Sequence, residues 1–201
     1  MGAQPERLLS KLAWFFVRHW LAILIVLMVI FIVPIVGAPY LESTGNPLLQ
    51  KIADALYTGY HVTCHQLPER SLFVFGYKMT VCARCFAIYL SFLAGCCIFA
   101  CVRTKLKIWP IWLYVLLCVP MAIDGTAQLF GIAIPREIGP GGQLIWTVES
   151  TNALRIITGT IFGLASAFYV LPYLQEIFSE PPAASQKSAD EHPSPEKSAA
   201  R

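Results

Sequence analysis

Residues 20–36 read WLAILIVLMVIFIVPIV and contain no charged side chain. A helix over this stretch crosses the roughly 30 Å of hydrocarbon in a bilayer once flanking aromatic residues and modest tilt are included. Three further apolar stretches are comparable, at residues 85–102, 108–123 and 156–171. The 201-residue chain is 56% hydrophobic and 13% charged, whereas about a quarter of the residues of a soluble domain are charged. We therefore predict an all-α, polytopic membrane protein with a four-transmembrane-helix bundle.

The basic residues indicate how the chain is oriented. They precede the first stretch, fill the turn at residues 103–107 and recur in the C-terminal tail. By the positive-inside rule, both termini then lie in the cytoplasm and the chain is multi-pass in the cell (inner) membrane. Residues 36–38 also resemble a signal-peptide cleavage site, but the length and aromatic flank of the first stretch favour a retained span.

Three parts follow from this organisation. We expect a cytoplasmic N-terminal segment at residues 1–19, a four-helix membrane domain at 20–176 and a disordered cytoplasmic tail at 177–201, which is rich in Pro, Ala, Ser, Glu and Lys. The net charge of +3 is scattered among loops and forms no basic stripe, so we expect membrane lipids and no nucleic acid as partners.

A short amphipathic helix is predicted between the first two spans. Asn46 and Pro47 form a typical helix start, and Leu48, Ile52, Leu56 and Tyr60 recur at four-residue spacing. A helix over residues 47–60 would lie at the membrane interface. With four spans, segments 37–84 and 124–155 must lie on the same side of the membrane, so their polar residues can share one surface.

The seven cysteines fall into two groups. Four lie inside apolar runs, where a thiol packs as a small hydrophobe. The other three, Cys64, Cys82 and Cys85, lie in or beside polar segments. Cys82 and Cys85 have the spacing that aims two sulfurs at one ion, and Cys64 with His65 can complete a tetrahedral metal site, although His61 is an alternative ligand. Thiolate ligands favour zinc as the cofactor, and iron is also compatible.

Two other interpretations of these cysteines remain open, and both need no metal. A Cys-x-x-Cys pair at a helix N-terminus with Arg84 between the sulfurs favours thiolate, as in thiol redox chemistry. A structural disulfide or packed thiols would instead hold the loop to the helix.

A polar pocket is expected beside the cysteines. Asp124 follows an apolar run and has too short a side chain to reach the interface, so a buried partner is expected, either Arg155 or Arg84. Glycines and prolines at residues 135–142 predict an irregular loop that folds over the site. The residues assigned to the pocket are Arg70, Ser71, Arg84, Asp124, Asn152 and Arg155.

Four motifs in a fixed order carry a resemblance that covers about residues 55–170. They are CHQLPERS at 64–71, CARC at 82–85, PMAID with Gly125 at 120–125, and Ser150-x-Asn152-x-x-Arg155. The chain resembles a family of small predicted membrane proteins of bacteria and archaea, a domain of unknown function recognised by its Cys-His and Cys-x-Arg-Cys motifs. The resemblance implies a multi-pass membrane fold and no particular activity. It implies that the cysteines, His65 and the pocket residues are characteristic positions, whereas His61 and Glu149 are outside the pattern.

Three function classes remain, and whether the chain is an enzyme stays open among them. The first is a Cys/His metal site at the extracytoplasmic membrane face beside the Arg/Asp/Asn pocket, acting on a lipid or a quinone. The second is a quinone-linked thiol-disulfide oxidoreductase. The third is a non-catalytic subunit or assembly factor of a larger membrane complex.

Overall fold

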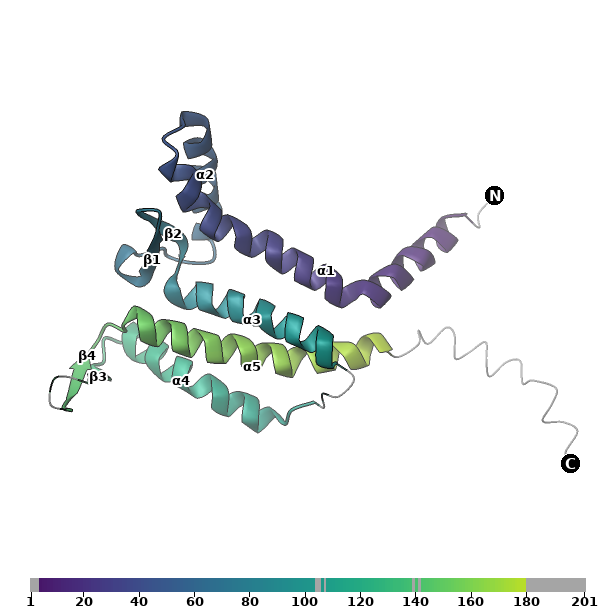
Figure 1. Ribbon diagram of the computed structural model, residues 1–201. Helices are drawn as coiled ribbons and strands as arrows, with labels where there is room; N and C mark the ends of the chain where they lie inside the picture. Colours follow the sequence, from purple (N-terminus) through teal and green to yellow (C-terminus); the bar gives the residue numbers. More distant parts are fainter. Residues whose placement is uncertain (1–3, 104–105, 107, 139, 141, 180–201) are drawn as a thin grey trace, which may run out of the picture.

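The computed structural model describes residues 4–103, 106, 108–138, 140 and 142–179, with the side chains of 4–10, 137 and 179 left aside. These residues form long helices and two small hairpins (Figure 1). In chain order the elements are α1 (Gln4–Ser43), α2 (Pro47–His61), the 3-10 turn η1 (Pro68–Arg70), β1 (Ser71–Val74), β2 (Tyr77–Cys82), α3 (Ala83–Val102), α4 (Ile111–Leu129), β3 (Ile134–Ile138), β4 (Leu144–Thr147) and α5 (Asn152–Ser179).

Four of the helices are long and apolar enough to cross a membrane, as predicted: Lys11–Ser43 within α1, Ala83–Val102, Ile111–Leu129 and Asn152–Phe178. Helix α1 is longer than the predicted span at both ends and continues through Pro34 and Pro39 to Ser43. Proline is tolerated inside a transmembrane helix because neighbouring groups satisfy the backbone atoms that it frees. Helix α5 runs to Ser179, past the predicted start of the tail at 177, and the rest of the tail lies outside the described residues.

The bundle is closest between α3 and α5, because small residues face each other there. A Cβ atom at Gly159 would lie 2.7 Å from the carbonyl oxygen of Arg84, and one at Gly163 would lie 2.5 Å from that of Ile88. Farther along, Gly95 of α3 faces Ala167 of α5. Glycine lets the two backbones approach within a distance that any side chain would prevent, as in other membrane helix pairs.

Helix α1 packs against α3 through two apolar clusters. One joins Leu21 to Cys96 and Phe99, and the other surrounds Ile35 with α2 and β2 residues such as Tyr60 and Met79. Cys96 is therefore buried packing, as expected of the cysteines in apolar runs, whereas Cys97 and Cys101 are exposed on the helix surface.

Helix α2 forms where the amphipathic pattern predicts it. The Asn46 side chain accepts a hydrogen bond of 2.9 Å from the backbone N–H of Leu48, which caps the helix. Tyr57 donates to the Lys78 carbonyl and Tyr60 donates to the Phe31 carbonyl, so α2 is fastened to both β2 and α1.

The hairpin β1–β2 was not predicted. Phe75 and Gly76 both have positive φ, at 56° and 82°, and form the tight turn between Val74 and Tyr77. A bulge follows, since Phe73 pairs with Lys78 but Ser71 pairs with Cys82. The bulge breaks the alternation of the strand, and Met79, Thr80 and Val81 are all buried.

The loop between α4 and α5 differs from the prediction of an irregular lid. Its described residues form the antiparallel hairpin β3–β4, in which Pro135 pairs with Trp146 and Glu137 with Ile145. Proline is accommodated because β3 has a partner on one edge only.

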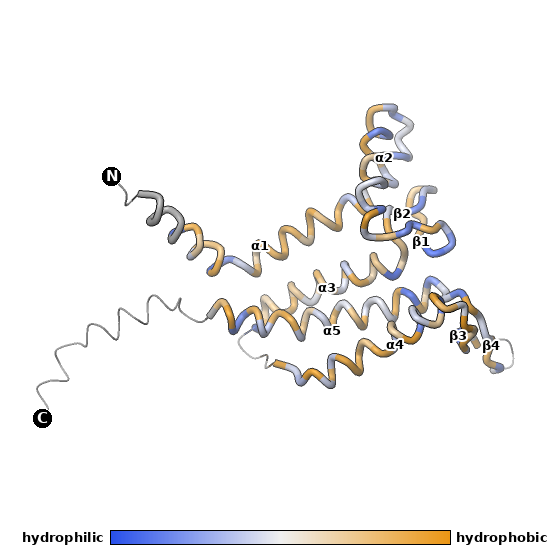
Figure 2. Tube along the Cα trace, turned by 180° about the vertical axis from the view of Figure 1, so that it is seen from behind, coloured by the Kyte–Doolittle hydropathy of each residue, from blue (hydrophilic) through white to orange (hydrophobic). Residues whose placement is uncertain are grey.

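Both hairpins lie at the same end of the bundle, beside the first turns of α3 and α5 and the last turn of α4 (Figure 1). Figure 2 shows that hydrophilic residues concentrate at this end, whereas the helices beyond it are mostly hydrophobic. The fold therefore brings segments 37–84 and 124–155 to a shared face, which we call the site face.

Candidate functional site

Three cysteine sulfurs meet at the site face. Cys64 follows α2, Cys82 ends β2 and is the N-cap of α3, and Cys85 lies in the first turn of α3. Their Sγ atoms all lie within 4.8 Å of one another, and all three residues are free thiols that are buried or half-buried. Sulfurs that share a zinc ion at about 2.3 Å lie about 4 Å apart, so this spacing fits one metal ion after small side-chain adjustments.

The loop that carries Cys64 is held in place from both sides. The backbone N–H of Cys64 donates to the Tyr60 carbonyl at 3.0 Å, which extends α2 by a turn. Gln66 adopts a positive φ of 54°, donates its side-chain amide to the Tyr57 carbonyl at 2.6 Å and receives Lys78 Nζ on its own carbonyl at 3.1 Å. The positive φ is a strained conformation for glutamine that these contacts maintain.

The sulfurs also interact directly with their surroundings. The backbone N–H of Cys82 donates to Cys64 Sγ at 3.2 Å. Hydrogen bonds from the thiols of Cys82 and Cys85 hold the pKa of Cys64 well below its usual range. The position of Cys64 therefore favours a thiolate, which is the form that binds metals and reacts as a nucleophile.

His65 is exposed and lines the same cavity as the sulfurs, but it is not part of the sulfur group. His61 is exposed at the end of α2. Among the described residues, the structure thus assembles three of the four predicted ligands into one cluster.

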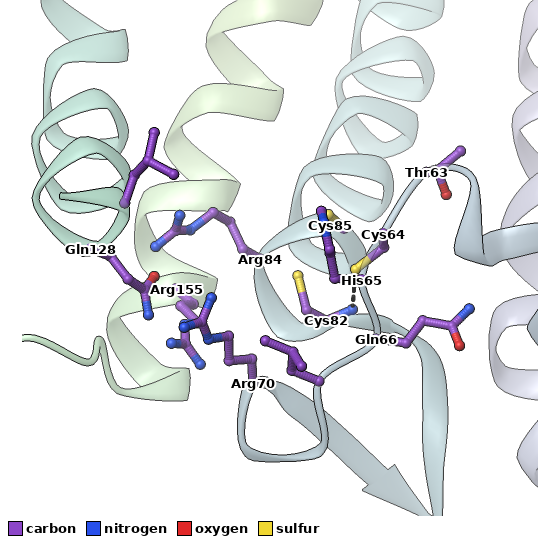
Figure 3. A pocket seen from close by; sticks show the side chains of 12 residues that line it. Thr63, Cys64, His65, Gln66, Arg70, Cys82, Arg84, Cys85, Gln128 and Arg155 are labelled. Carbon is purple, nitrogen blue, oxygen red and sulfur yellow. Dashed lines mark hydrogen bonds between the residues drawn. The ribbon is translucent and has the colours of Figure 1, made fainter. Parts of the chain in front are cut away.

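A cavity of about 380 Å³ opens beside the sulfurs (Figure 3). Arg70, Arg84 and Arg155 reach it from η1, α3 and α5, and in Figure 3 they gather on one side of the three sulfurs. Its complete lining is Thr63, Cys64, His65, Gln66, Leu67, Arg70, Cys82, Arg84, Cys85, Gln128, Leu129 and Arg155. The cavity therefore combines a corner lined by three sulfurs with a cationic wall.

Asp124 has two arginine partners behind this wall. Its carboxylate accepts from Arg84, one of the two partners that the sequence offered, and from Arg136 Nε at 2.8 Å. Arg136 is fully buried and also donates to the carbonyl of Val148 at 2.6 Å. Asp124 thus joins α3, α4 and the β3–β4 hairpin.

Arg155 pairs with Glu149 and not with Asp124. The two carboxylate oxygens of Glu149 accept from Arg70 at 2.8 Å and from Arg155 at 3.0 Å, and Gln128 donates to the second oxygen. The pKa of Glu149 is below its usual value. Burial alone would raise this pKa, but the hydrogen bond and charge of Arg70, together with Gln128 and Arg155, outweigh the effect of burial.

Ser71 and Asn152 lie outside the cavity lining and support it from behind. Ser71 donates to the Leu67 carbonyl at 2.9 Å, which closes the η1 turn. Asn152 donates to the Ser71 carbonyl at 3.5 Å and accepts from Arg155 at 3.3 Å. At the start of α5, the Thr151 hydroxyl accepts from the Leu154 N–H at 3.2 Å and caps the helix.

Three residues of this network were not predicted as site residues: Gln128, Arg136 and Glu149. Glu149 carried a signal that could have found it, because an acidic residue just before a transmembrane helix with Arg155 in its first turn is placed for a local ion pair. Arg136 carried none, since its position depends on a hairpin that the sequence did not indicate.

Comparison with known proteins places this site in a family context. The profile of the family described as "Predicted membrane protein (DUF2085)" matches residues 64–169, which begin at Cys64 and include the cavity-lining residues of α3, α4 and α5.

Two archaeal relatives are similar over much of their length. An uncharacterized protein of Methanocaldococcus jannaschii, MJ1492, is 37% identical over 164 residues, which is 80% of this chain and 96% of the relative. An uncharacterized protein of Methanothermobacter thermautotrophicus is 31% identical over 108 residues, or 54% of this chain and 84% of the relative. No solved structure matches.

Proposed function

The chain belongs to the DUF2085 family of predicted membrane proteins, and we propose that it is a zinc protein whose metal lies at the site face of the membrane bundle. Cys64, Cys82 and Cys85 hold the ion, and its fourth coordination position faces the arginine-lined cavity. A lipid or quinone that enters from the bilayer then binds beside the metal. The proposal places the site on the extracytoplasmic side and both termini in the cytoplasm.

The observation that carries the proposal is the convergence of three sulfurs within 4.8 Å, one from the loop after α2 and two from the start of α3. Packing alone does not require this, because apolar residues fill the rest of the cluster around Cys64. Thiolate sulfur favours zinc over the oxygen-seeking magnesium and calcium ions, and the N–H of Cys82 on Cys64 is the type of contact that orients a metal ligand.

Three protein ligands leave one coordination position for water or a substrate oxygen. A zinc ion supplies a Lewis acid at that position. Three thiolates give the centre a net charge of about −1, which weakens its pull on an oxygen atom. Arg84 and Arg70 line the same cavity and offset this charge, so they are placed to hold the oxygen atoms of a bound molecule.

Elemental analysis of the purified full chain tests the proposal. About one zinc per chain is expected in the wild type, and loss of zinc is expected in Cys64→Ser, Cys82→Ser and Cys85→Ser. The matched control is Cys118→Ser in α4, a cysteine outside the cluster, which should keep its zinc. Replacement of zinc by cobalt should add a sulfur-to-cobalt charge-transfer band, which reports the thiolate ligands directly.

His65→Ala distinguishes an open site from a closed one. With three sulfur ligands, this variant keeps its metal; if His65 moves in as a fourth ligand, the metal content falls. Wild-type protein without stoichiometric metal would overturn the proposal.

A second candidate is a thiol-disulfide oxidoreductase, in which a quinone accepts the electrons as two cysteine thiols are oxidised to a disulfide. It is favoured by the fact that the three clustered cysteines are all free and lie near enough for any two to pair after side-chain rotation. Two electrons and two protons would leave a dithiol and reduce the quinone to quinol. Metal-free protein in which ubiquinone-1 removes two titratable thiols per chain would establish it.

A further inference from the structure

The cationic wall of the cavity is built from three separate parts of the chain. Arg70 comes from η1, Arg84 from the first turn of α3 and Arg155 from the first turn of α5. Like charges repel, so a fold that brings three guanidinium groups to one cavity needs negative charge between them. The N-terminal ends of the long helices α3 and α5 add partial positive charge at the same face.

The carboxylates of the network do not balance this charge. Asp124 and Glu149 are shared among Arg70, Arg84, Arg136 and Arg155, which leaves an excess of two positive charges. A zinc ion with three thiolates would remove about one of them. An excess of positive charge therefore remains whether or not the metal is bound.

Two donors at the wall are also unused. Nε of Arg70 and Nε of Arg84 are buried and have no hydrogen-bond partner within the part of the chain that the structure describes. A buried donor without an acceptor costs free energy, and because both Nε atoms are shielded from solvent, the oxygen atoms of a ligand reach them only when the guanidinium groups turn toward the cavity. A guanidinium group binds oxyanions in a bidentate manner through Nε and Nη together.

Glu149 shows that the arginines of the wall bind an oxyanion. Its carboxylate already binds Arg70 at 2.8 Å and Arg155 at 3.0 Å, yet its side chain is 56% exposed and lies outside the cavity lining. An exposed carboxylate exchanges easily with another anion, because water replaces the contacts that it loses.

We propose that the cavity binds a phosphate group, with Arg70, Arg84 and Arg155 as donors, and that Glu149 competes with it for Arg70 and Arg155. Phosphate would then be the substrate class of the proposed function. The phosphate inference rests on that function only in that both proposals place their ligands in the same cavity. A tetrahedral oxyanion presents oxygen atoms in the several directions from which the three arginines come, whereas a quinone is neutral and leaves the excess charge unbalanced. The phosphate belongs either to a lipid headgroup or to a free ion.

The binding experiment uses the full chain in dodecyl maltoside, a detergent without phosphate. Thermal unfolding is followed against sodium phosphate, with sodium chloride at matched ionic strength as the reference, and separately against phosphatidic acid added to the micelles. Stabilisation by phosphate beyond chloride assigns a free ion, and stabilisation by phosphatidic acid that phosphate does not reproduce assigns a lipid headgroup. Either result supports the inference.

Variants connect the binding to the wall. Arg70→Gln should weaken binding of the active probe by about tenfold, because a charged donor is lost. Glu149→Gln should strengthen it several-fold, because the competing carboxylate is gone. Arg103→Gln is the matched control, since Arg103 follows α3 at the opposite end of the bundle, and it should leave the affinity unchanged.

Equal effects of phosphate, phosphatidic acid and chloride would overturn the inference, as would a tenfold loss in Arg103→Gln or stabilisation by ubiquinone-1 alone. The zinc proposal and the phosphate inference are separated by measuring both zinc content and phosphate binding in the wild type and in Cys82→Ser, which is expected to be metal-free. If the wild type holds zinc but binds neither phosphate probe, only the phosphate inference fails. If phosphate binds but neither protein holds zinc, only the zinc proposal fails.

Discussion

Arg84 and Asp124 form an ion pair that links the first turn of α3 to the last turns of α4, although 40 residues separate them in sequence. Asp124 is almost completely buried and accepts from Arg136 with its other carboxylate oxygen. One carboxylate therefore determines how α3, α4 and the β3–β4 hairpin meet at the site face. It also fixes the direction in which Arg84 enters the cavity.

Removal of this carboxylate should destabilise the protein strongly. Asp124→Asn leaves the fully buried Arg136 without a counter-charge, and we expect a loss of about 3–5 kcal/mol in the free energy of unfolding. Denaturant unfolding in detergent, followed by tryptophan fluorescence, measures this change. Asp54→Asn on the exposed surface of α2 is the matched control and should stay within about 0.5 kcal/mol. Equal stability of the two variants would show that the buried pair is dispensable.

The α3–α5 contact should not tolerate a side chain at Gly163. A Cβ atom there would lie 2.5 Å from the carbonyl oxygen of Ile88, so Gly163→Ala must push the helices apart. We expect a cost of about 1–3 kcal/mol and a lower melting temperature. Gly37→Ala in α1, where nothing lies within 4 Å of the added atom, should be neutral or stabilising. The prediction fails if both alanine variants melt like the wild type.

The ion pairs of Glu149 should give a pH-dependent contribution to stability. Its pKa in the folded protein is below the usual value, so the ionised form stabilises the fold above about pH 4.3, the ordinary pKa of glutamate. The contribution is lost as the pH falls through the lower, folded-state pKa. The wild type should therefore melt above Glu149→Gln at pH 7, and the difference should shrink as the pH falls below about 4.3. A melting-temperature difference that stays constant over this range would contradict the assignment.

The topology can be tested with reporter fusions. The C-terminal end of α3 and the N-terminal end of α4 lie at the opposite end of the bundle from strands β3 and β4, whereas both hairpins lie at one end (Figure 1). Fusions after Ile108 and after Gly142 should therefore report opposite sides of the membrane. A third fusion, after Gly76, should agree with the one after Gly142. Disagreement between these two would place the cysteines and Asp124 on different sides and would exclude a shared cavity.

Hydropathy and local helix signals were sufficient for the helical part of the fold. The four spans follow from apolar runs that are long and hydrophobic enough to cross a membrane. Helix α2 follows from Asn46, Pro47 and the four-residue apolar repeat. The close contact of Cys64 with Cys82 and Cys85 was also predicted, because ligand spacing is a local property of the sequence.

The hairpins and part of the charge network needed the structure. Phe75 and Gly76 form a turn in which a bulky residue has positive φ, and this pair lacks the Asn-Gly or Asp-Gly signal of a typical hairpin. The bulge hides the alternation of β2, so the strand resembles a plain apolar run. Arg136 reaches Asp124 only because β3 pairs with β4, and pairing between strands is not a local property.

The bulge in β1–β2 divides this hairpin into a free tip and a fixed stem. The stem pairs Ser71 with Cys82 and directly adjoins α3, whereas the tip beyond Phe73 and Lys78 has its own register. Residues added at the turn lengthen the tip and leave the Cys82 sulfur where it is, whereas one residue added between Lys78 and Cys82 shifts Cys82 itself. The turn can therefore change in length without moving Cys82 away from Cys64 and Cys85, whereas the length of residues 78–82 cannot change.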